Sequence, residues 1–226
     1  MFQIRGNIAA RLTLFVLLVS LAACAQFNSG SGEKPDSAES IRLRSGSGNP
    51  EAGREKSLLC QGCHGLYGKS SEPLIPSLAG QYGSYIAKQL RNYQAGTRSH
   101  QIMNAMAATV NDQDLADIAA YFASQPKMKG GPAPGNAIGR QLFLNDDRAR
   151  KVIGCVNCHG VNGKGLAPGF AMFPVIGGQQ KDYIRLQLVN FRGSYRTNSP
   201  GNVMNRIAAR LTDKEVEALA EYISAL

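Results

Sequence analysis

Apolar residues recur three and four positions apart along much of the chain, and no stretch alternates apolar and polar residues over the length of a strand. This pattern predicts amphipathic helices. The expected helices run from Asn49-Pro50 toward Cys60, over 82–93 and 181–191, and from capping-box-like sequences at 111–114 and 212–215 to near Ser124 and Ala225. Tyr85, Tyr93, Tyr183 and Phe191 lie at helical spacing and are expected to pack in the core. The predicted fold class is all-α.

Glycine and proline concentrate in three stretches that interrupt this helical pattern. Residues 65–81 and 160–179 are expected to be loops. Residues 126–135 contain three prolines and three glycines and are expected to form a linker. The linker would divide a first domain, residues 49–125, from a second domain, residues 136–226.

Two copies of one pentapeptide, Cys60-Gln61-Gly62-Cys63-His64 and Cys155-Val156-Asn157-Cys158-His159, contain four of the chain's cysteines and two of its histidines. CxxCH is the attachment signature of c-type haem. Two thiols bond to the two vinyl groups of one porphyrin, and the adjacent imidazole binds the iron. The two motifs therefore predict two covalent haem c groups, one per motif.

Three other uses of paired cysteines remain as alternatives. A thioredoxin-like CxxC belongs in a βαβ pattern, which neither motif has around it. A zinc site of four thiolates, or a pair of structural disulfides, would leave the two adjacent histidines unexplained.

The sequence after the first motif is repeated after the second. The first copy passes through Pro76, Gly80-Gln81, Tyr85-Ile86, Gln89-Leu90 and Met103, and the second through Pro174, Gly178-Gln179, Tyr183-Ile184, Gln187-Leu188 and Met204. Such a repeat predicts two related domains with one haem each. A charged insertion at 144–153 is the main interruption.

Met103 and Met204 occupy equivalent places in the repeat, so we expect them to be the second axial ligands of the two irons. A thioether is a soft, neutral ligand, and His/Met ligation raises the reduction potential of a haem. None of the other candidates has a methionine or histidine partner in the other copy: Met106, Met128 and Met172 are expected to fill the core, and His100 to lie at the surface or be satisfied by a local partner.

These motifs together resemble a dihaem class I cytochrome c, closest to the cytochrome c4 group, over residues 48–226. The resemblance implies two tandem cytochrome c domains, each wrapped around one covalent haem. It also implies a periplasmic electron carrier between a quinol-oxidising complex or dehydrogenase and a terminal oxidase. Because His and Met would fill both axial positions, an enzymatic role is not expected. A fixed cytochrome subunit of such a complex, a dihaem peroxidase and a ligand sensor remain alternatives.

The first residues have the features of a targeting segment. Arg5 and Arg11 accompany an apolar run, residues 12–21, that is too short to span a bilayer, so residues 1–23 are expected to be a signal peptide. Leu21-Ala22-Ala23-Cys24 resembles the lipobox of bacterial lipoproteins, which implies lipidation of Cys24 and attachment to a membrane. The alternative is an ordinary signal peptide with an incidental cysteine. Residues 24–48 have the composition of a flexible tether.

Charge is unevenly distributed along the chain. Residues 25–125 contain nine Lys or Arg and nine Asp or Glu, whereas residues 126–226 contain fourteen and seven. A basic second half favours docking to an acidic redox partner or to anionic headgroups, with scattered solubilising charge as the alternative. Nucleic acid is not an expected partner, because the chain has an export signal and no recognition motif.

Overall fold

The computed structural model describes residues 37, 39, 44–131, 136–166 and 172–226. The chain divides into two units, residues 1–35 and 36–226, and every described residue belongs to the second. The expected signal peptide, Cys24 and most of the expected tether therefore lie outside the described residues.

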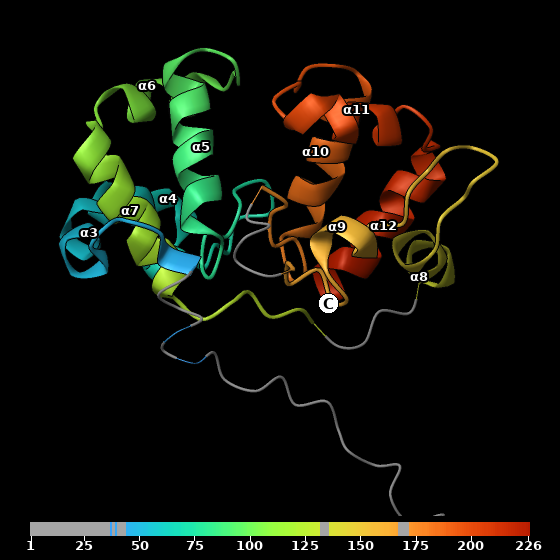
Figure 1. Cartoon of the computed structure of the whole chain (residues 1–226), viewed down its shortest axis with the longest axis horizontal. Coiled ribbons are helices and arrows are strands. Elements are labelled where there is room, and N and C mark those ends of the chain that lie inside the picture. Colours follow the sequence, from blue (N-terminus) through green and yellow to red (C-terminus); the bar gives the residue numbers. More distant parts are fainter. Residues whose placement is uncertain (1–36, 38, 40–43, 132–135, 167–171) are drawn as a thin grey trace, which may run out of the picture. The chain divides into compact units, whose positions relative to one another are not determined.

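The first domain is helical, as expected. Its elements are α3 (Pro50–Lys56), α4 (Leu58–His64), the 3₁₀ turn η1 (Leu66–Gly68), α5 (Gly83–Gln94), α6 (Gln101–Ala108) and α7 (Asp112–Ser124). Figure 1 shows them in blue to green, with α7 lying between α3 and α5. The segment between η1 and α5 forms the loop predicted after the first motif.

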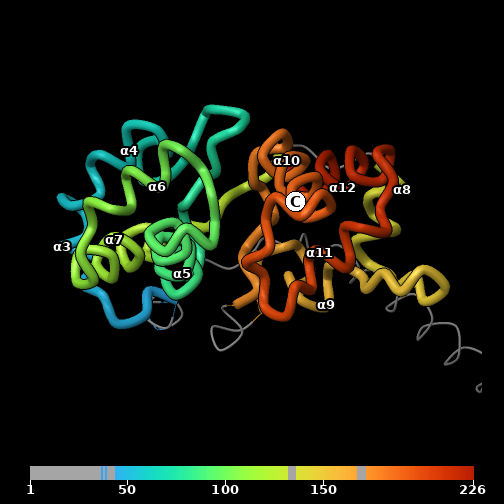
Figure 2. The backbone as a smooth tube through the Cα atoms, turned by 90° about the horizontal axis from the view of Figure 1, so that it is seen from above, coloured from blue at the N-terminus to red at the C-terminus, as the bar shows by residue number. Residues whose placement is uncertain are grey.

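The second domain repeats the succession of five helices, but its 3₁₀ turn comes one helix later. It contains α8 (Ala137–Leu144), α9 (Val156–His159), α10 (Lys181–Arg192), the 3₁₀ turn η3 (Pro200–Asn202), α11 (Val203–Ala208) and α12 (Asp213–Ala225). The tube in Figure 2 shows both sets of helices from above. Among the described residues the extended pairing is limited to one isolated bridge, Asp147 to Val152, so the all-α prediction is confirmed.

Polar caps begin the helices where the sequence predicted them. The Asn49 side chain accepts hydrogen bonds from the backbone N–H groups of Glu51 and Ala52 at the start of α3. Thr212 and Glu215 form a reciprocal capping box at the start of α12. These caps satisfy backbone donors that the first turn of a helix otherwise leaves unpaired.

A glycine lets the first and last helices of each domain cross at close range. A Cβ atom added at Gly53 of α3 would lie 2.0 Å from the Asp117 carbonyl oxygen of α7, and one at Gly139 of α8 would lie 2.1 Å from the Ala218 carbonyl oxygen of α12. Phe122 and Phe143 are fully buried in the cores of the two domains.

Three expectations about the chain outside these helices need correction. Arg44 and Ser45 are buried, and Arg44 Nε donates to the Ala123 carbonyl oxygen of α7, so the tether ends before residue 48. The start of the linker is packed, because Met128 is buried against Tyr82 and Val175. Met172 is 53% exposed and is not a core residue.

None of the helices in the described part of the chain has the length and apolar character needed to cross a membrane.

Candidate functional site

Each CxxCH motif lies on a short helix that follows the first helix of its domain. Cys60 and Cys63 belong to α4, and Cys155 and Cys158 lie at the start and in the body of α9. No disulfide joins any of these four cysteines in the structure, so the disulfide alternative finds no support at these residues. Burial raises the pKa of the Cys60 thiol and raises that of Cys155 to about 12. Within the described residues, no group of three or more Cys, His, Asp or Glu comes together as a zinc site would require.

The motif histidines are held in the same way in both domains. Nδ1 of His64 donates to the Pro76 carbonyl oxygen and Nδ1 of His159 to the Pro174 carbonyl oxygen, each at 2.8 Å. A carbonyl can only accept, so each Nδ1 carries the proton and Nε2 keeps its lone pair for a metal. Burial lowers the pKa of both imidazoles, which favours this neutral form.

The two sites open into one cavity of about 520 Å³ that both domains line. All four motif cysteines and both motif histidines line it, and most of the other lining residues are apolar. Its charged lining is positive, from Lys88, Arg98 and Arg196, and includes no Asp or Glu of the described residues. An apolar cavity with cysteine, imidazole and cationic groups fits a flat porphyrin that carries carboxylate side chains.

The predicted methionine ligands lie on equivalent helices. Met103 of α6 and Met204 of α11 both line the cavity. The Met103 N–H donates to Nδ1 of His100 at 3.3 Å, and the Met204 N–H donates to Oγ of Ser199 at 3.2 Å. His100 is therefore an exposed helix cap, in agreement with its expected role. Met106 also lines the cavity rather than filling the core, so the choice between Met103 and Met106 rests on the repeat.

An asparagine after each predicted ligand anchors the short methionine helix. Asn104 Nδ2 donates to the carbonyl oxygens of Tyr93 and Arg98, and Asn205 Nδ2 donates to those of Phe191 and Arg196. The repeat contained this asparagine pair, but its anchoring role was not predicted.

Reciprocal glutamine contacts join the two domains. Gln81 accepts from the Val175 N–H and donates to the Val175 carbonyl oxygen, at 2.9 and 2.8 Å. Gln179, its equivalent in the repeat, makes the same pair of contacts with Ser77, at 2.8 and 3.0 Å. The two domains therefore face each other about an approximate twofold axis.

A second reciprocal pair uses buried arginines. Arg98 donates to the Tyr183 hydroxyl at 3.0 Å, and Arg196 donates to the Tyr85 hydroxyl at 2.9 Å. Tyr85 packs against the buried Tyr82, Met128 and Val175, as the core prediction requires, but the prediction missed that the hydroxyl groups of Tyr85 and Tyr183 each bind the arginine of the opposite domain. Tyr93 and Phe191 are buried as expected.

Lys88 breaks this symmetry. Its Nζ donates to the Asn198 carbonyl oxygen of the second domain at 2.6 Å. Burial lowers its pKa, as do the nearby charges of Arg196 and Arg98. The repeat places Leu186 at the matching position, so a third cation enters the interface from one domain.

The model of the family described as Cytochrome c matches residues 51–126 and 137–226, one match for each domain. The chain belongs to the cytochrome c family. This cytochrome c carries two covalent haem c groups and is a dihaem electron-transfer protein of the cytochrome c4 type, as the next comparisons show.

Cytochrome c4 of Pseudomonas aeruginosa is 41% identical over 187 residues, which cover 81% of this chain and 92% of that protein. The crystal structure of reduced cytochrome c4 from Pseudomonas stutzeri has a TM-score of 0.75 and 39% identity, and the match covers 80% of this chain and 100% of that one. A thiosulfate dehydrogenase electron acceptor of Stutzerimonas stutzeri is 33% identical, with 79% of this chain and 82% of that protein covered. The dihaem, cytochrome c4-like prediction is confirmed.

Proposed function

We propose that this cytochrome passes single electrons between membrane-associated redox complexes in the bacterial periplasm, with entry at one domain and exit at the other. The observation that carries the proposal is the cavity shared by both CxxCH sites, since it brings the two redox centres to one interface. The Gln81 and Gln179 contacts hold that interface closed.

The chain's own residues hold each centre in place. Cys60 and Cys63, and in the second domain Cys155 and Cys158, form the thioether bonds. His64 and His159 would bind the iron through Nε2, and Met103 and Met204 would supply the second ligand in each domain. When bound, haem supplies a reversible one-electron couple. With a histidine and a methionine holding each iron, the centre would exchange electrons through the protein surface and would leave no iron position for a substrate.

We infer the donors and acceptors from the family resemblance. A quinol-oxidising complex or a dehydrogenase would supply electrons, and a terminal oxidase would receive them. A relative named as a thiosulfate dehydrogenase electron acceptor supports a dehydrogenase as an electron donor. A fixed cytochrome subunit of a dehydrogenase is the second candidate.

A spectrum with added carbon monoxide and hydrogen peroxide tests this function. Saturated His/Met iron should bind neither ligand at neutral pH, and each domain should reduce and reoxidise reversibly. Rapid binding of carbon monoxide would instead indicate a ligand sensor, and turnover of peroxide would indicate a dihaem peroxidase.

Cys24 tests the proposed anchor. Cys24→Ala with an ordinary secretory signal should release a folded, dihaem protein into the soluble periplasmic fraction, since several acyl chains are needed for stable attachment. Continued attachment of this variant after a salt wash would favour the fixed subunit.

A further inference from the structure

The insertion between α8 and α9 forms a turn that the first domain lacks. Ser57 alone separates α3 from α4, whereas residues 145–155 separate α8 from α9. Within it, Asp147 and Val152 exchange two backbone hydrogen bonds of 2.8 and 2.9 Å, and the Lys151 N–H donates to the Arg148 carbonyl oxygen. Residues 146–152 are the charged turn.

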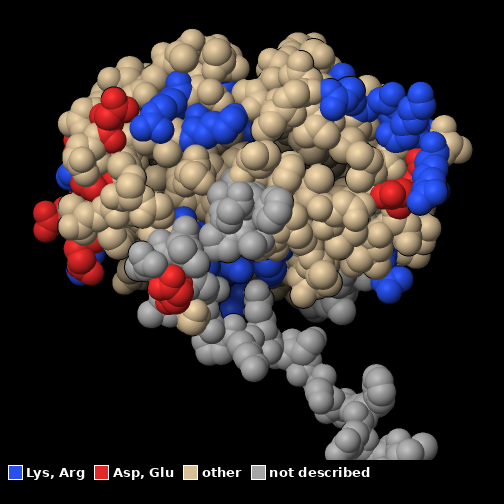
Figure 3. All heavy atoms as spheres, viewed as in Figure 1, with Lys and Arg blue, Asp and Glu red and all other residues tan. Residues whose placement is uncertain are grey.

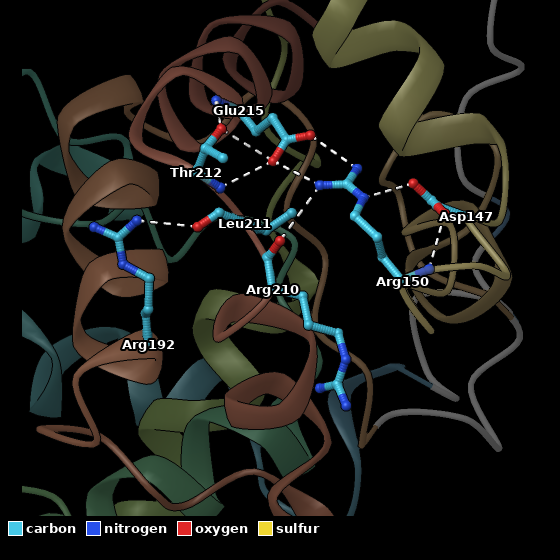
Figure 4. A network of polar contacts seen from close by, with 7 residues as sticks. All are labelled: Asp147, Arg150, Arg192, Arg210, Leu211, Thr212 and Glu215. Atoms are coloured by element: carbon cyan, nitrogen blue, oxygen red, sulfur yellow. Dashed lines mark hydrogen bonds and ion pairs between the residues drawn. The ribbon is translucent and has the colours of Figure 1, made fainter.

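Arg150 fixes the charged turn to α12. Its guanidinium lies 2.6 Å from the Asp147 carboxylate and 2.8 Å from that of Glu215, which also caps α12 through Thr212. Figure 4 shows Arg150 between these two carboxylates. Arginine presents a rigid fork of donors that suits such a double contact. The carboxylates of Asp147 and Glu215 thus hold the charged turn in place through Arg150.

Asp146 fixes the charged turn to the second haem motif. Its carboxylate accepts from the Gly154 N–H and from the side chain of Asn157, both at 2.9 Å. Asn157 lies between Cys155 and Cys158, so the turn has a set position relative to the second redox centre.

The outer residues of the turn are cations. Arg148 and Lys151 are exposed, and neither side chain has a hydrogen-bond or ion-pair partner among the described residues. Lys151 has a left-handed backbone, with φ 55°, which costs about 1 kcal/mol or more for a residue other than glycine. In Figure 3 the edge of the second domain that carries the turn shows mainly Lys and Arg, with a smaller acidic area. Ile153, which follows the turn, is 45% exposed and lines the cavity.

We propose that Arg148 and Lys151 form the site at which the second domain docks an acidic patch on a protein redox partner. The proposal rests on the electron-carrier function proposed above and adds the surface and the kind of partner. Cations at the rim of an encounter surface raise the association rate by steering an oppositely charged partner, and Ile153 offers an apolar contact next to the redox centre.

Two cations favour a protein partner over a lipid surface. Each Lys or Arg near an anionic leaflet contributes about 1 kcal/mol, so the pair alone would hold the domain on headgroups only weakly. A transient redox encounter uses a small interface with fast release, and two rim charges suit it because they raise the association rate while adding little buried area.

The test measures reduction of the full, haem-loaded protein by reduced plant-type ferredoxin, a small acidic iron–sulfur protein, in a stopped-flow instrument. One electron passes from the reduced cluster to ferric haem in each event. Arg148→Ser/Lys151→Ser should lower the second-order rate of the second haem about three- to tenfold at low ionic strength, and the difference should vanish at high salt. Arg148→Lys/Lys151→Arg should keep the original rate.

Arg54→Ser/Lys69→Ser is the matched control, because it removes two exposed cations from the first domain. An equal loss of rate in the control would show that only net charge matters and would overturn the site. Lost binding to vesicles with 30% phosphatidylserine, with an unchanged ferredoxin rate, would assign the turn to lipid instead. Reduction by ascorbate reports on the carrier function itself, so a variant defective only with ferredoxin supports the docking site.

Discussion

The two domains of this cytochrome differ most in the connection between their first two helices, which is Ser57 in the first domain and residues 145–155 in the second. They share the His to Pro contact, the glycine at the helix crossing, the asparagine beside the methionine and the glutamine at the interface. They differ in the polar contact that ties the first helix region to the last helix. The first domain uses Lys56 with Asp117, and the second uses Arg150 of the charged turn with Glu215.

This contrast separates two kinds of constraint on a duplicated domain. Repeated contacts hold the haem or the opposite domain, where both copies need the same geometry. The divergent contacts each lie within one domain and involve no residue that lines the shared cavity, so each domain can vary them independently. Lys88, present in one copy only, is the exception, because it introduces asymmetry within the interface itself.

The largest effect should come from the predicted methionine ligands. Met204→Ala should lower the potential of the second haem by about 0.1 V or more, a fraction of the range of roughly 0.8 V over which axial ligands act. The first haem should be nearly unchanged, and Met103→Ala should give the converse. Redox titration measures the potentials of the two haems. The long-wavelength absorption band of ferric His/Met haem reports whether the methionine ligand is lost. Loss of that band in Met106→Ala but not in Met103→Ala would show that the alignment of the two copies is wrong.

Crowding the helix crossings should have the next largest effect. Gly139→Ala places a Cβ against α12 and Gly53→Ala places one against α7, so each should destabilise its own domain by about 2–3 kcal/mol. Thermal unfolding, followed by the His/Met absorption of each haem, shows which domain is affected. Gly131→Ala is the control, because a Cβ there meets no atom within 4 Å. Equal destabilisation by Gly131→Ala would show that the close helix crossings do not explain the loss of stability.

The sequence predicted the elements that depend on local pattern. Asn49 and Thr212 cap helices as predicted, because capping depends on residues close along the chain. That both CxxCH histidines are buried at the ends of short helices was not predicted. The Gln81 and Gln179 pair was visible as a repeat. The role of this pair in joining the domains could not be predicted, because a repeat does not show that its two copies face each other.

Two further features were missed because the contacting groups lie far apart in the sequence. Tyr85 and Tyr183 fit the apolar pattern of their helices, yet the opposite domain supplies an arginine to each hydroxyl. Arg44 lay in a stretch of linker-like composition, but one guanidinium binding a helix end is enough to order it. One signal for the arginine–tyrosine contacts was present in the sequence, since Arg98 and Arg196 occupy matching positions in the two copies.

The reciprocal glutamines offer a smaller test of the interface. Gln81→Ala and Gln179→Ala each remove two hydrogen bonds between the domains, and each should weaken the coupled unfolding of the domains by about 1–2 kcal/mol. Since the contacts are related by symmetry, the two losses should be similar. The double variant measures their coupling. Unfolding of both domains at unchanged denaturant midpoints would show that these bonds add nothing to the interface.

The smallest effect concerns acid stability and separates the two domains. Asp117 is buried, and Lys56 and the Asn49 N–H lower the pKa of its carboxyl group. A group with a lowered pKa in the folded state stabilises that state fully above its unfolded pKa, about 3.9, and loses this contribution as pH falls through the lowered value. Asp117→Asn should therefore destabilise the first domain at neutral pH, and its stability curve should approach that of the original protein in acid. Asp112→Asn, on an exposed side chain of the same helix, is the control. Denaturant unfolding from pH 7 to pH 3 gives the curves, and two parallel curves would show that Asp117 carries no proton-linked stability.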